Sequence, residues 1–394
     1  MGRFIDDAER RSRLGRRHRL AAAERIDDVA TIADDLVAVH SSDPATVYLT
    51  LGARMANPRL AVIDSALYDD VSLIRHHAMR RTMWVMTPAV AVLAHAAATA
   101  KVAKVQRKRT IDSLATAAAI ADPEAWLAEA TAEIRLLIAR RGAMTAREVG
   151  QSLPHLAVPI RIGGGNHTVA MNAHPRVMQF AGFDGDLVRG RPTGGWTSSE
   201  YRWDSMQSVL GRPIGDLEEA DAAGELLGRW LDRFGPATIT DITWWFGWTV
   251  GLAKTALARS EAIEVETSLG QSFVANGDDQ PVGHPEPWVA VLPGLDATSM
   301  GWKQRDFYLD TEMVPRVFDR FGNAGPKLWA DGRIVGGWAQ RQDGSIALDI
   351  LSSLTDRQAR LLSEEAHRVS QLIGDTVVRP RFPSPNQKEL LAEH

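Results

Sequence analysis

The stretch Leu36-Val-Ala-Val-His40-Ser41-Ser42-Asp43-Pro44 joins an apolar run to a strong signal for the start of a helix. Pro44 suits the first position of a helix, because that position needs no amide hydrogen, and Asp43 or Ser42 can cap the free amides that follow. Apolar residues recur at helical spacing over residues 25–38, just before this junction. We therefore expect an amphipathic helix, a short polar junction and a second helix.

A second stretch, Leu73-Ile-Arg75-His-His-Ala-Met79-Arg80-Arg81-Thr82-Met-Trp-Val-Met-Thr87-Pro88, carries the pattern Arg-x-x-x-Met-Arg-x-Thr. Together with the first stretch it resembles the winged-helix superfamily that contains the AlkZ and YcaQ DNA glycosylases. That family has Gly where this chain has Arg81. Residues 287–296 and 322–338 also resemble the C-terminal domain of the family, so the resemblance runs over nearly the whole chain.

The resemblance implies enzymes that remove alkylated or crosslinked bases and bind duplex DNA in a concave basic channel. The family has Gln, an apolar residue and then Gln or Asp where this chain has His40, Ser41 and Ser42. A neutral imidazole can accept a proton from water, and a serine hydroxyl can orient that water. His40, Ser42 and Asp43 are therefore the candidate catalytic residues. An ionised Asp43 close to His40 favours the imidazolium and raises the pKa of His40, whereas burial lowers it. If Asp43 caps a solvent-accessible helix, we expect the carboxylate to dominate and the pKa of His40 to lie above 6.5.

Length and composition set the class of protein. The chain has 394 residues, of which 45% are hydrophobic and 24% charged, and it has no cysteine. This length predicts two to four domains, and the missing cysteines exclude disulfides, zinc–thiolate sites and a thiol nucleophile. No uninterrupted apolar run approaches 18 residues, and no apolar signal core begins the chain. We expect a cytoplasmic, monomeric protein that is not in a membrane and uses neither a metal nor a cofactor.

The charge is distributed unevenly along the chain. Residues 1–110 contain 18 basic and 12 acidic residues, although the whole chain has a net charge of −4. Between Val71 and Ile111 there are eight basic residues and no acidic one. Such a field favours a polyanion, since neutralised phosphates release counterions, although a merely solvated helix face is the alternative. The candidate DNA-binding residues are Arg75, Arg80, Arg81, Lys101, Lys104 and Lys108.

Two segments 93 residues apart repeat one pattern. Each has a helix (residues 126–140 and 220–233), a short loop and a capping box that begins a second helix, Thr145-x-x-Glu148 in one and Thr238-x-x-Asp241 in the other. Residues 185–190 and 262–266 are the expected wings. Each repeat is a helix-turn-helix candidate, and it either contacts DNA or serves as a structural module.

Residues beyond 287 change to short strand patterns. The expected strands are residues 288–292, 327–330, 333–340 and 345–351, with Asp331-Gly332 and Asp343-Gly344 as turns and a final helix over residues 356–373. The predicted fold is mostly α with β: tandem winged-helix (helix-turn-helix) domains followed by a C-terminal β-barrel-like domain. The domains are residues 1–112, which include an arginine-rich basic arm, then 113–218, 219–275 and 276–394.

Four further patterns have mainly structural interpretations. His76 and His77 point apart if they lie on a helix, which disfavours a metal site. Residues 163–167 fit a flexible hairpin or wing better than a nucleotide loop. Residues 244–248 are an aromatic cluster that favours the core over base stacking. Asp296, Lys303 and Arg305 can reach a ligand, although nothing near them has the composition of a catalytic cluster.

The sequence leaves three functions open. The first is a DNA glycosylase that acts on alkylated or bulky-adducted purines in duplex DNA, with His40 and Ser42 around the hydrolytic water. The second is a DNA-binding regulator or lesion-binding shield without chemistry. The third is a protein whose channel holds a small molecule.

Overall fold

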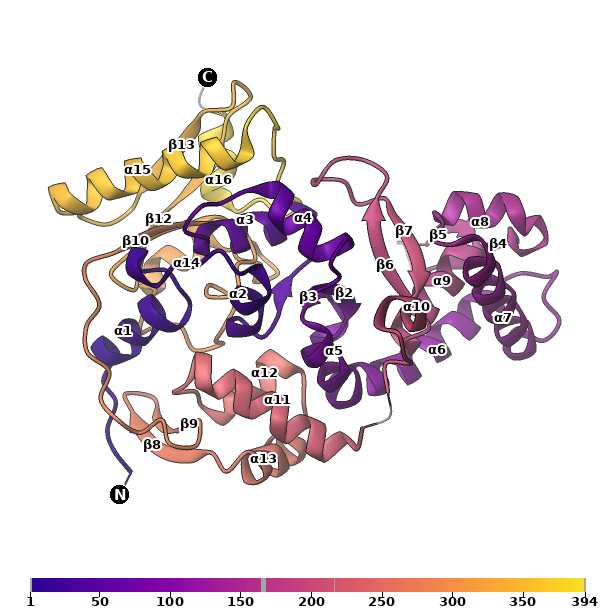
Figure 1. Cartoon of the computed structure of the whole chain (residues 1–394), viewed down its shortest axis with the longest axis horizontal. Coiled ribbons are helices and arrows are strands. Elements are labelled where there is room, and N and C mark those ends of the chain that lie inside the picture. The colour runs from indigo at the N-terminus through magenta and orange to yellow at the C-terminus, as the bar shows by residue number, and fades with distance from the viewer. Residues whose placement is uncertain (1, 164–167, 216, 393–394) are drawn as a thin grey trace.

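The computed structural model describes residues 2–163, 168–215 and 217–392, which fold into helices and five small antiparallel sheets (Figure 1). The helices are α1 (Asp7–Arg17), α2 (Val29–Asp35), α3 (Pro44–Arg54), α4 (Leu60–Tyr68), α5 (Pro88–Ala94), α6 (Ala100–Leu114), α7 (Pro123–Arg141), α8 (Ala146–Ser152), α9 (Ala173–Asp184), α10 (Met206–Leu210), α11 (Glu219–Phe234), α12 (Ile239–Phe246), α13 (Val250–Arg259), α14 (Val314–Val317), α15 (Asp356–Ile373) and α16 (Pro385–Ala392). The strands are β1 (Val39–His40), β2 (Ile74–His77), β3 (Met83–Met86), β4 (Pro159–Ile162), β5 (Val169–Asn172), β6 (Leu187–Pro192), β7 (Tyr201–Ser205), β8 (Ile263–Thr267), β9 (Gly270–Val274), β10 (Val289–Leu292), β11 (Lys327–Ala330), β12 (Arg333–Gln340) and β13 (Ile346–Ile350).

The first sheet joins the two stretches with which the sequence analysis began. β3 lies between β1 and β2 and is antiparallel to both, so that His40 pairs with Trp84 and Arg75 with Val85. His76 and His77 therefore lie on a strand, and their predicted placement on a helix is wrong. His77 stacks on Phe183 at 3.8 Å between ring centroids. Among the described residues, no group of three or more metal-ligating side chains is placed to hold an ion.

The arginine-rich N-terminus is a packed helix, so the prediction of a basic arm is wrong. Arg10 and Arg13 of α1 are only 3% and 1% exposed. Arg13 pairs with Glu9 and with Asp278, and the Arg10 guanidinium lies 3.7 Å from the centre of the Phe307 ring. The charges of Arg10 and Arg13 are therefore engaged by contacts within the protein. The following helix, α2, is shorter than the helix predicted over residues 25–38.

Both predicted repeats have the same local structure. Thr145 and Thr238 form capping boxes with Glu148 and Asp241, at the starts of α8 and α12. In each repeat the residue before the threonine bridges to the second strand of a hairpin: Met144 to Trp203 of β7, and Ala237 to Phe273 of β9. The helix, loop, helix and hairpin follow in the predicted order, and their assignment as winged helices stays a prediction. The glycine-rich stretch over residues 163–167 lies between β4 and β5, and residues 164–167 are outside the described ones.

The C-terminal strands form an open sheet with the order β10-β11-β12-β13. All three pairings are antiparallel, and no strand in the described part of the chain joins β10 to β13, so the expected barrel-like closure is absent there. Apolar residues of α15 pack with Val289, Val291 and Leu328 on one face of the sheet. The helix covers the face that a second layer of barrel strands would cover. α16, which the sequence analysis missed, contacts β12 and β13.

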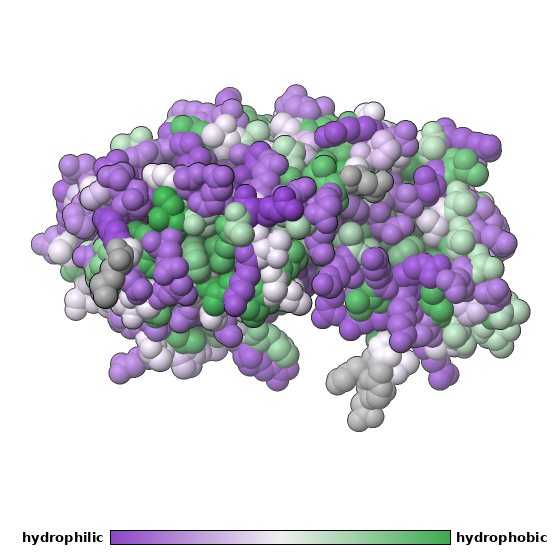
Figure 2. Space-filling model, turned by 90° about the horizontal axis from the view of Figure 1, so that it is seen from below, coloured by the Kyte–Doolittle hydropathy of each residue, from purple (hydrophilic) through white to green (hydrophobic). Residues whose placement is uncertain are grey.

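The two largest hydrophobic cores among the described residues lie in two lobes of unequal size. Residues of α7, α8, α9 and β6 share one core, and they form the lobe at the right of Figure 1. The larger core joins the first sheet to α11, α12 and the loops after β10. Figure 2 shows hydrophilic residues over both lobes and a notch between the lobes. The predicted partition into four domains stays a prediction.

One helical stretch, Pro88–Leu114, is long and apolar enough to cross a membrane by length and composition alone. Half of its most apolar window is buried inside the protein. Its second half exposes Lys101, Lys104 and Lys108. Because a core helix of a globular protein has the same properties, this stretch is weak evidence for a membrane span.

Candidate functional site

The candidate motif lies at the junction of β1 and α3. The Asp43 carboxylate accepts a hydrogen bond from the Ala45 amide at 3.1 Å, and Pro44 occupies the first turn of α3. The predicted helix start is therefore confirmed. β1 holds His40 in a sheet while α3 fixes Asp43, so the two intervening serines are positioned from both sides.

His40 is buried, with 5% of its surface exposed. Its ring centroid lies 4.8 Å from that of Trp84, and its Nδ1 accepts a hydrogen bond from the Ser42 amide at 3.3 Å. This places the proton of the neutral ring on Nε2. Burial, reinforced by the charge of Arg80, lowers the pKa of His40 to about 3. The predicted upward shift is wrong, because burial outweighs any effect of Asp43.

The Asp43 carboxylate is occupied by backbone amides. Its second oxygen accepts from the Arg381 amide at 2.9 Å, and the Arg381 guanidinium donates to the Ser42 carbonyl at 3.2 Å. Burial raises the pKa of the Asp43 carboxyl, and the amides of Arg381 and Ala45 oppose that shift. The C-terminal segment therefore contacts the motif through Arg381. No local pattern in the sequence indicates this contact.

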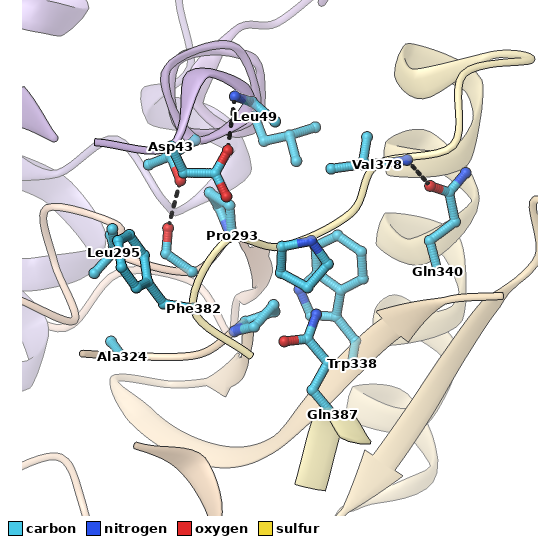
Figure 3. A pocket seen from close by; sticks show the side chains of 15 residues that line it. Asp43, Leu49, Pro293, Leu295, Ala324, Trp338, Gln340, Val378, Phe382 and Gln387 are labelled. Atoms are coloured by element: carbon cyan, nitrogen blue, oxygen red, sulfur yellow. Dashed lines mark hydrogen bonds between the residues drawn. The ribbon is translucent and has the colours of Figure 1, made fainter. Parts of the chain in front are cut away.

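A cavity of about 30 Å³ lies beside Asp43 (Figure 3). Trp338, Phe382 and Pro293 are among the side chains that surround it. A volume of this size holds about two water-sized spheres, whereas a purine base is several times larger. This cavity is therefore too small to accept a base in this conformation of the protein.

Arg75 lies beneath the motif instead of on a DNA-facing surface. It is 2% exposed, its Nε donates to Ser41 Oγ at 2.8 Å, and its Nη1 donates to the Tyr68 hydroxyl. The Arg75 guanidinium also lies 4.7 Å from the centre of the Tyr201 ring. Burial therefore keeps Arg75 from an open DNA-facing surface, and its DNA-binding role stays a prediction. Tyr68 and Tyr201 belong to no pattern that the sequence offered for the site, and Arg189 was expected only as part of the wing over residues 185–190.

Arg80, Arg81 and Lys101, three of the predicted DNA-binding residues, lie around one larger cavity of about 410 Å³. Arg109 and Trp248 line it as well. Arg80 and Arg81 have φ values of 54° and 65°, in the left-handed region that costs energy for residues other than glycine. Such a turn between β2 and β3 persists only where its surroundings fix it.

Arg80 packs against aromatic residues of α12, whereas Lys104 and Lys108 lie on α6. The Arg80 guanidinium lies 4.3 Å from the centre of the Trp244 ring, and Gly247 has no side chain that would crowd it. Trp245, Phe246 and Trp248 are buried, which confirms the predicted core role of this cluster. Lys104 lines a second cavity together with Lys101, and Lys108 is exposed on α6.

The three residues that the sequence offered as ligand contacts near the C-terminus, Asp296, Lys303 and Arg305, lie in different environments. Asp296 is fully buried and forms an ion pair with Arg54, which is also fully buried. Asp296 is therefore a structural group that no ligand reaches. Lys303 is exposed, and Arg305 lies over the rings of Trp244 and Phe318.

Comparison with known proteins gives one family and one fold. The family model described as DNA glycosylase AlkZ-like matches residues 33–372. The solved structure of the DNA glycosylase AlkZ from Streptomyces sahachiroi is similar in fold, with a TM-score of 0.69 and 18% sequence identity. The similarity covers 96% of this chain and 98% of that one. No curated protein matches the chain.

Proposed function

The chain belongs to the AlkZ-like DNA glycosylase family, and from this membership we propose that it hydrolyses the N-glycosidic bond of alkylated or bulky-adducted purines in duplex DNA. His40 and Ser42 lie around the hydrolytic water in this proposal, with Asp43 beside them. The protein acts as a monomer on damaged duplex. The observation that carries the proposal is a neutral, buried imidazole at the first polar position of the motif.

The neutral imidazole explains how the changed motif can still work. A histidine with a pKa of about 3 is a weak base, but it remains an uncharged hydrogen-bonding group over the whole physiological range. The glutamine amide that occupies this position in the family is also uncharged and hydrogen-bonding. His40 therefore orients water as the amide does, and Ser42, which is half-buried, supplies a second hydroxyl contact.

The substrate chemistry fits such a weak catalyst. Cleavage of an N-glycosidic bond passes through a sugar with oxocarbenium character, which needs an oriented water and nearby negative charge. A purine alkylated at N7 or N3 already carries a positive charge, so it leaves without a strong acid. Asp43, when ionised, contributes negative charge near the sugar.

The DNA-binding surface in this proposal is the 410 Å³ cavity and the adjacent face of α6. Arg80, Arg81 and Lys101 are the phosphate ligands on the cavity, and Lys104 and Lys108 continue the surface along α6. The three lysines are exposed. Phosphate binding needs such accessible cations, because affinity arises from the counterions that they displace.

A second function, DNA binding without chemistry, is favoured by the burial of His40. Only 5% of its surface is exposed, which limits the contact of this ring with water and with the sugar. A protein of this kind would bind lesion-containing DNA and leave the base attached.

The two functions are separated by single-turnover incubation with a duplex containing N7-alkylguanine, followed by detection of free base and of abasic sites. We expect release by the wild type. The double variant His40→Ala/Ser42→Ala should lose about 10²- to 10⁴-fold in rate while it retains duplex affinity. His40→Gln, which restores the family residue, should retain activity.

His155→Ala/Ser152→Ala is the matched control, since these two residues lie outside the motif and His155 contacts Glu133 on the surface. It should release base at the wild-type rate. Wild-type binding without release across several cationic purine adducts would support the shield and contradict the glycosylase.

A further inference from the structure

Two arginines behind the motif have no carboxylate partner in the described part of the chain. Arg75 and Arg189 form no ion pair among the residues that the structure describes. Both guanidiniums lie beside the Tyr201 ring, at 4.7 Å and 5.5 Å from its centre. A buried cation without a compensating anion is unfavourable, because burial removes it from water.

Unsatisfied donors occur in the same place. Arg75 Nη2, Arg189 Nε and the Tyr201 hydroxyl are buried and have no hydrogen-bond partner in the described part of the chain. Arg75 is 2% and Tyr201 is 6% exposed, whereas Arg189 is half-buried. Native proteins pair nearly all such buried groups, so a cluster of three in one place indicates a bound partner.

The nearby carboxylates are already engaged. Asp64 and Asp69 form ion pairs with Arg191, and Asp43 accepts from the amides of Ala45 and Arg381. Burial, opposed by Tyr201 and reinforced by the charges of Arg75 and Arg381, lowers the pKa of Arg189 to about 10. The like charges gathered here therefore favour an anion from outside the chain.

We propose that Arg75, Arg189 and Tyr201 form a site for one DNA backbone phosphate beside the target nucleotide. The proposal rests on the proposed function, because it takes duplex DNA as the ligand. The ligand is an oxyanion, since guanidinium and hydroxyl groups both donate to phosphate oxygens. The link to the reacting nucleotide is Ser41, whose Oγ accepts from Arg75 Nε and whose neighbours are His40 and Ser42.

Arg189 is the most exposed of the three residues, because it is half-buried whereas Arg75 and Tyr201 are buried. Arg189 lies on β6, in the hairpin of the first repeat, and its guanidinium packs between the rings of Tyr201 and Trp203. A phosphate therefore contacts Arg189 from the solvent side, with Arg75 behind it. Such a phosphate places negative charge next to the sugar, where the reaction develops positive charge.

The test measures duplex affinity as a function of salt, without any need for base release. Arg189→Met removes the charge and keeps the stem that packs on the aromatic rings. It should weaken binding about tenfold and reduce the slope of log affinity against log salt by about one. Arg189→Lys should restore most of the slope. Arg191→Met is the matched control: it lies on the same strand, but its charge is already paired with Asp64 and Asp69, so the slope should not change.

A scan with single neutral methylphosphonate linkages locates the phosphate. One linkage next to the lesion should weaken wild-type binding about tenfold and leave Arg189→Met unaffected, because that contact is already lost. An unchanged slope in Arg189→Met, or equal losses at every linkage in both proteins, would overturn the phosphate site.

The scan also separates this site from the proposed function and from a free anion. Wild-type protein that binds no duplex would contradict the proposed function itself. Inorganic phosphate that raises the melting temperature of the wild type but not of Arg189→Met, together with a flat scan, would assign the site to a free anion and overturn the DNA assignment.

Discussion

The two repeats share a capping box, a helix pair and a hairpin, yet they differ in what surrounds them. The hairpin of the first repeat carries Arg189 and Arg191, and its capping residue Glu148 is 39% exposed in its side chain. The hairpin of the second carries Glu264 and Glu266, and its capping residue Asp241 is fully buried.

The N-terminal segment packs against the second hairpin, and Ile5 shares a small apolar cluster with Val265 and Val274. Phe4 pairs with Glu266 along the edge of β8, so this edge is covered. In the same repeat, the ring centroid of Trp245 in α12 lies 5.6 Å from that of Trp84, and Trp84 packs on His40. The second repeat therefore packs against the motif through Trp245 and Trp84. The first repeat carries arginines on its hairpin instead. One sequence pattern with one local structure serves two purposes, and burial and charge decide which.

The largest expected difference between the repeats is in stability. Asp241 accepts hydrogen bonds from the amides of Lys303 and Gln304, both at 2.9 Å, as well as from Thr238. Asp241→Ala leaves these buried donors unpaired and should cost about 3 to 5 kcal/mol of unfolding free energy. Glu148→Ala removes a solvent-exposed cap and should cost at most about 1 kcal/mol. Urea unfolding measures both, and equal losses would contradict the structural role assigned to the second repeat.

The next difference concerns DNA. Lys101, Lys104 and Lys108 are exposed on α6, whose C-terminal end packs in the core of the first repeat. Their triple replacement by Ala should reduce the salt slope of duplex binding by two to three, if all three contact phosphate, since each contact contributes roughly one unit.

The acidic hairpin provides the control for this measurement. Glu264→Gln/Glu266→Gln should leave the slope unchanged, because that hairpin contacts no phosphate. A slope that responds to the acidic pair and not to the lysines would reverse the roles of the two repeats.

The remaining effect is absent at neutral pH and grows only as the pH falls, and it tests the burial of His40. An unfolded histidine has a pKa near 6.5, whereas that of His40 is about 3. The unfolded chain therefore binds the proton more readily, so the contribution of His40 to stability is complete above pH 6.5 and is lost as the pH falls toward 3. Relative to His40→Gln, the wild type should lose about 1.4 kcal/mol per pH unit in that window.

Urea unfolding of the two proteins at pH 7, 5.5 and 4.5 measures this difference, and groups common to both cancel. Base excision should be flat over the physiological range, on a lesion whose uncatalysed loss is itself flat. A constant stability difference between the proteins, or an inflection of excision near pH 6.5, would mean that His40 is solvated in solution.

Local patterns in the sequence predicted much of the fold. Capping boxes, strand alternation and turn residues act over a few neighbours, and they placed α8, α12, α15 and β12 correctly. Charges that lie far apart in the chain were less predictable. Arg13 meets Asp278, which lies 265 residues away, and this contact turns an apparent basic arm into a buried helix.

In the candidate site, too, local features were predictable and contacts between distant residues were not. The helix start at Asp43 follows from three adjacent residues, so the sequence predicts it. The pKa of His40 depends on its burial beside Trp84, and Arg75 meets Tyr201 only once β2 and the first hairpin pack together. The residues themselves were visible in the sequence, but their environments were not.

The hydrogen bond from Arg75 to Ser41 has a consequence for how the motif can change. Ser41 stands where the family has an apolar residue, and its hydroxyl is the acceptor for Arg75 Nε. Replacing Ser41 alone with an apolar residue would orphan a second nitrogen on a guanidinium that already has one unpaired. A reversion at position 41 therefore affects the hydrogen bonding of Arg75 as well as the motif itself, whereas His40→Gln leaves the bond between Arg75 and Ser41 in place.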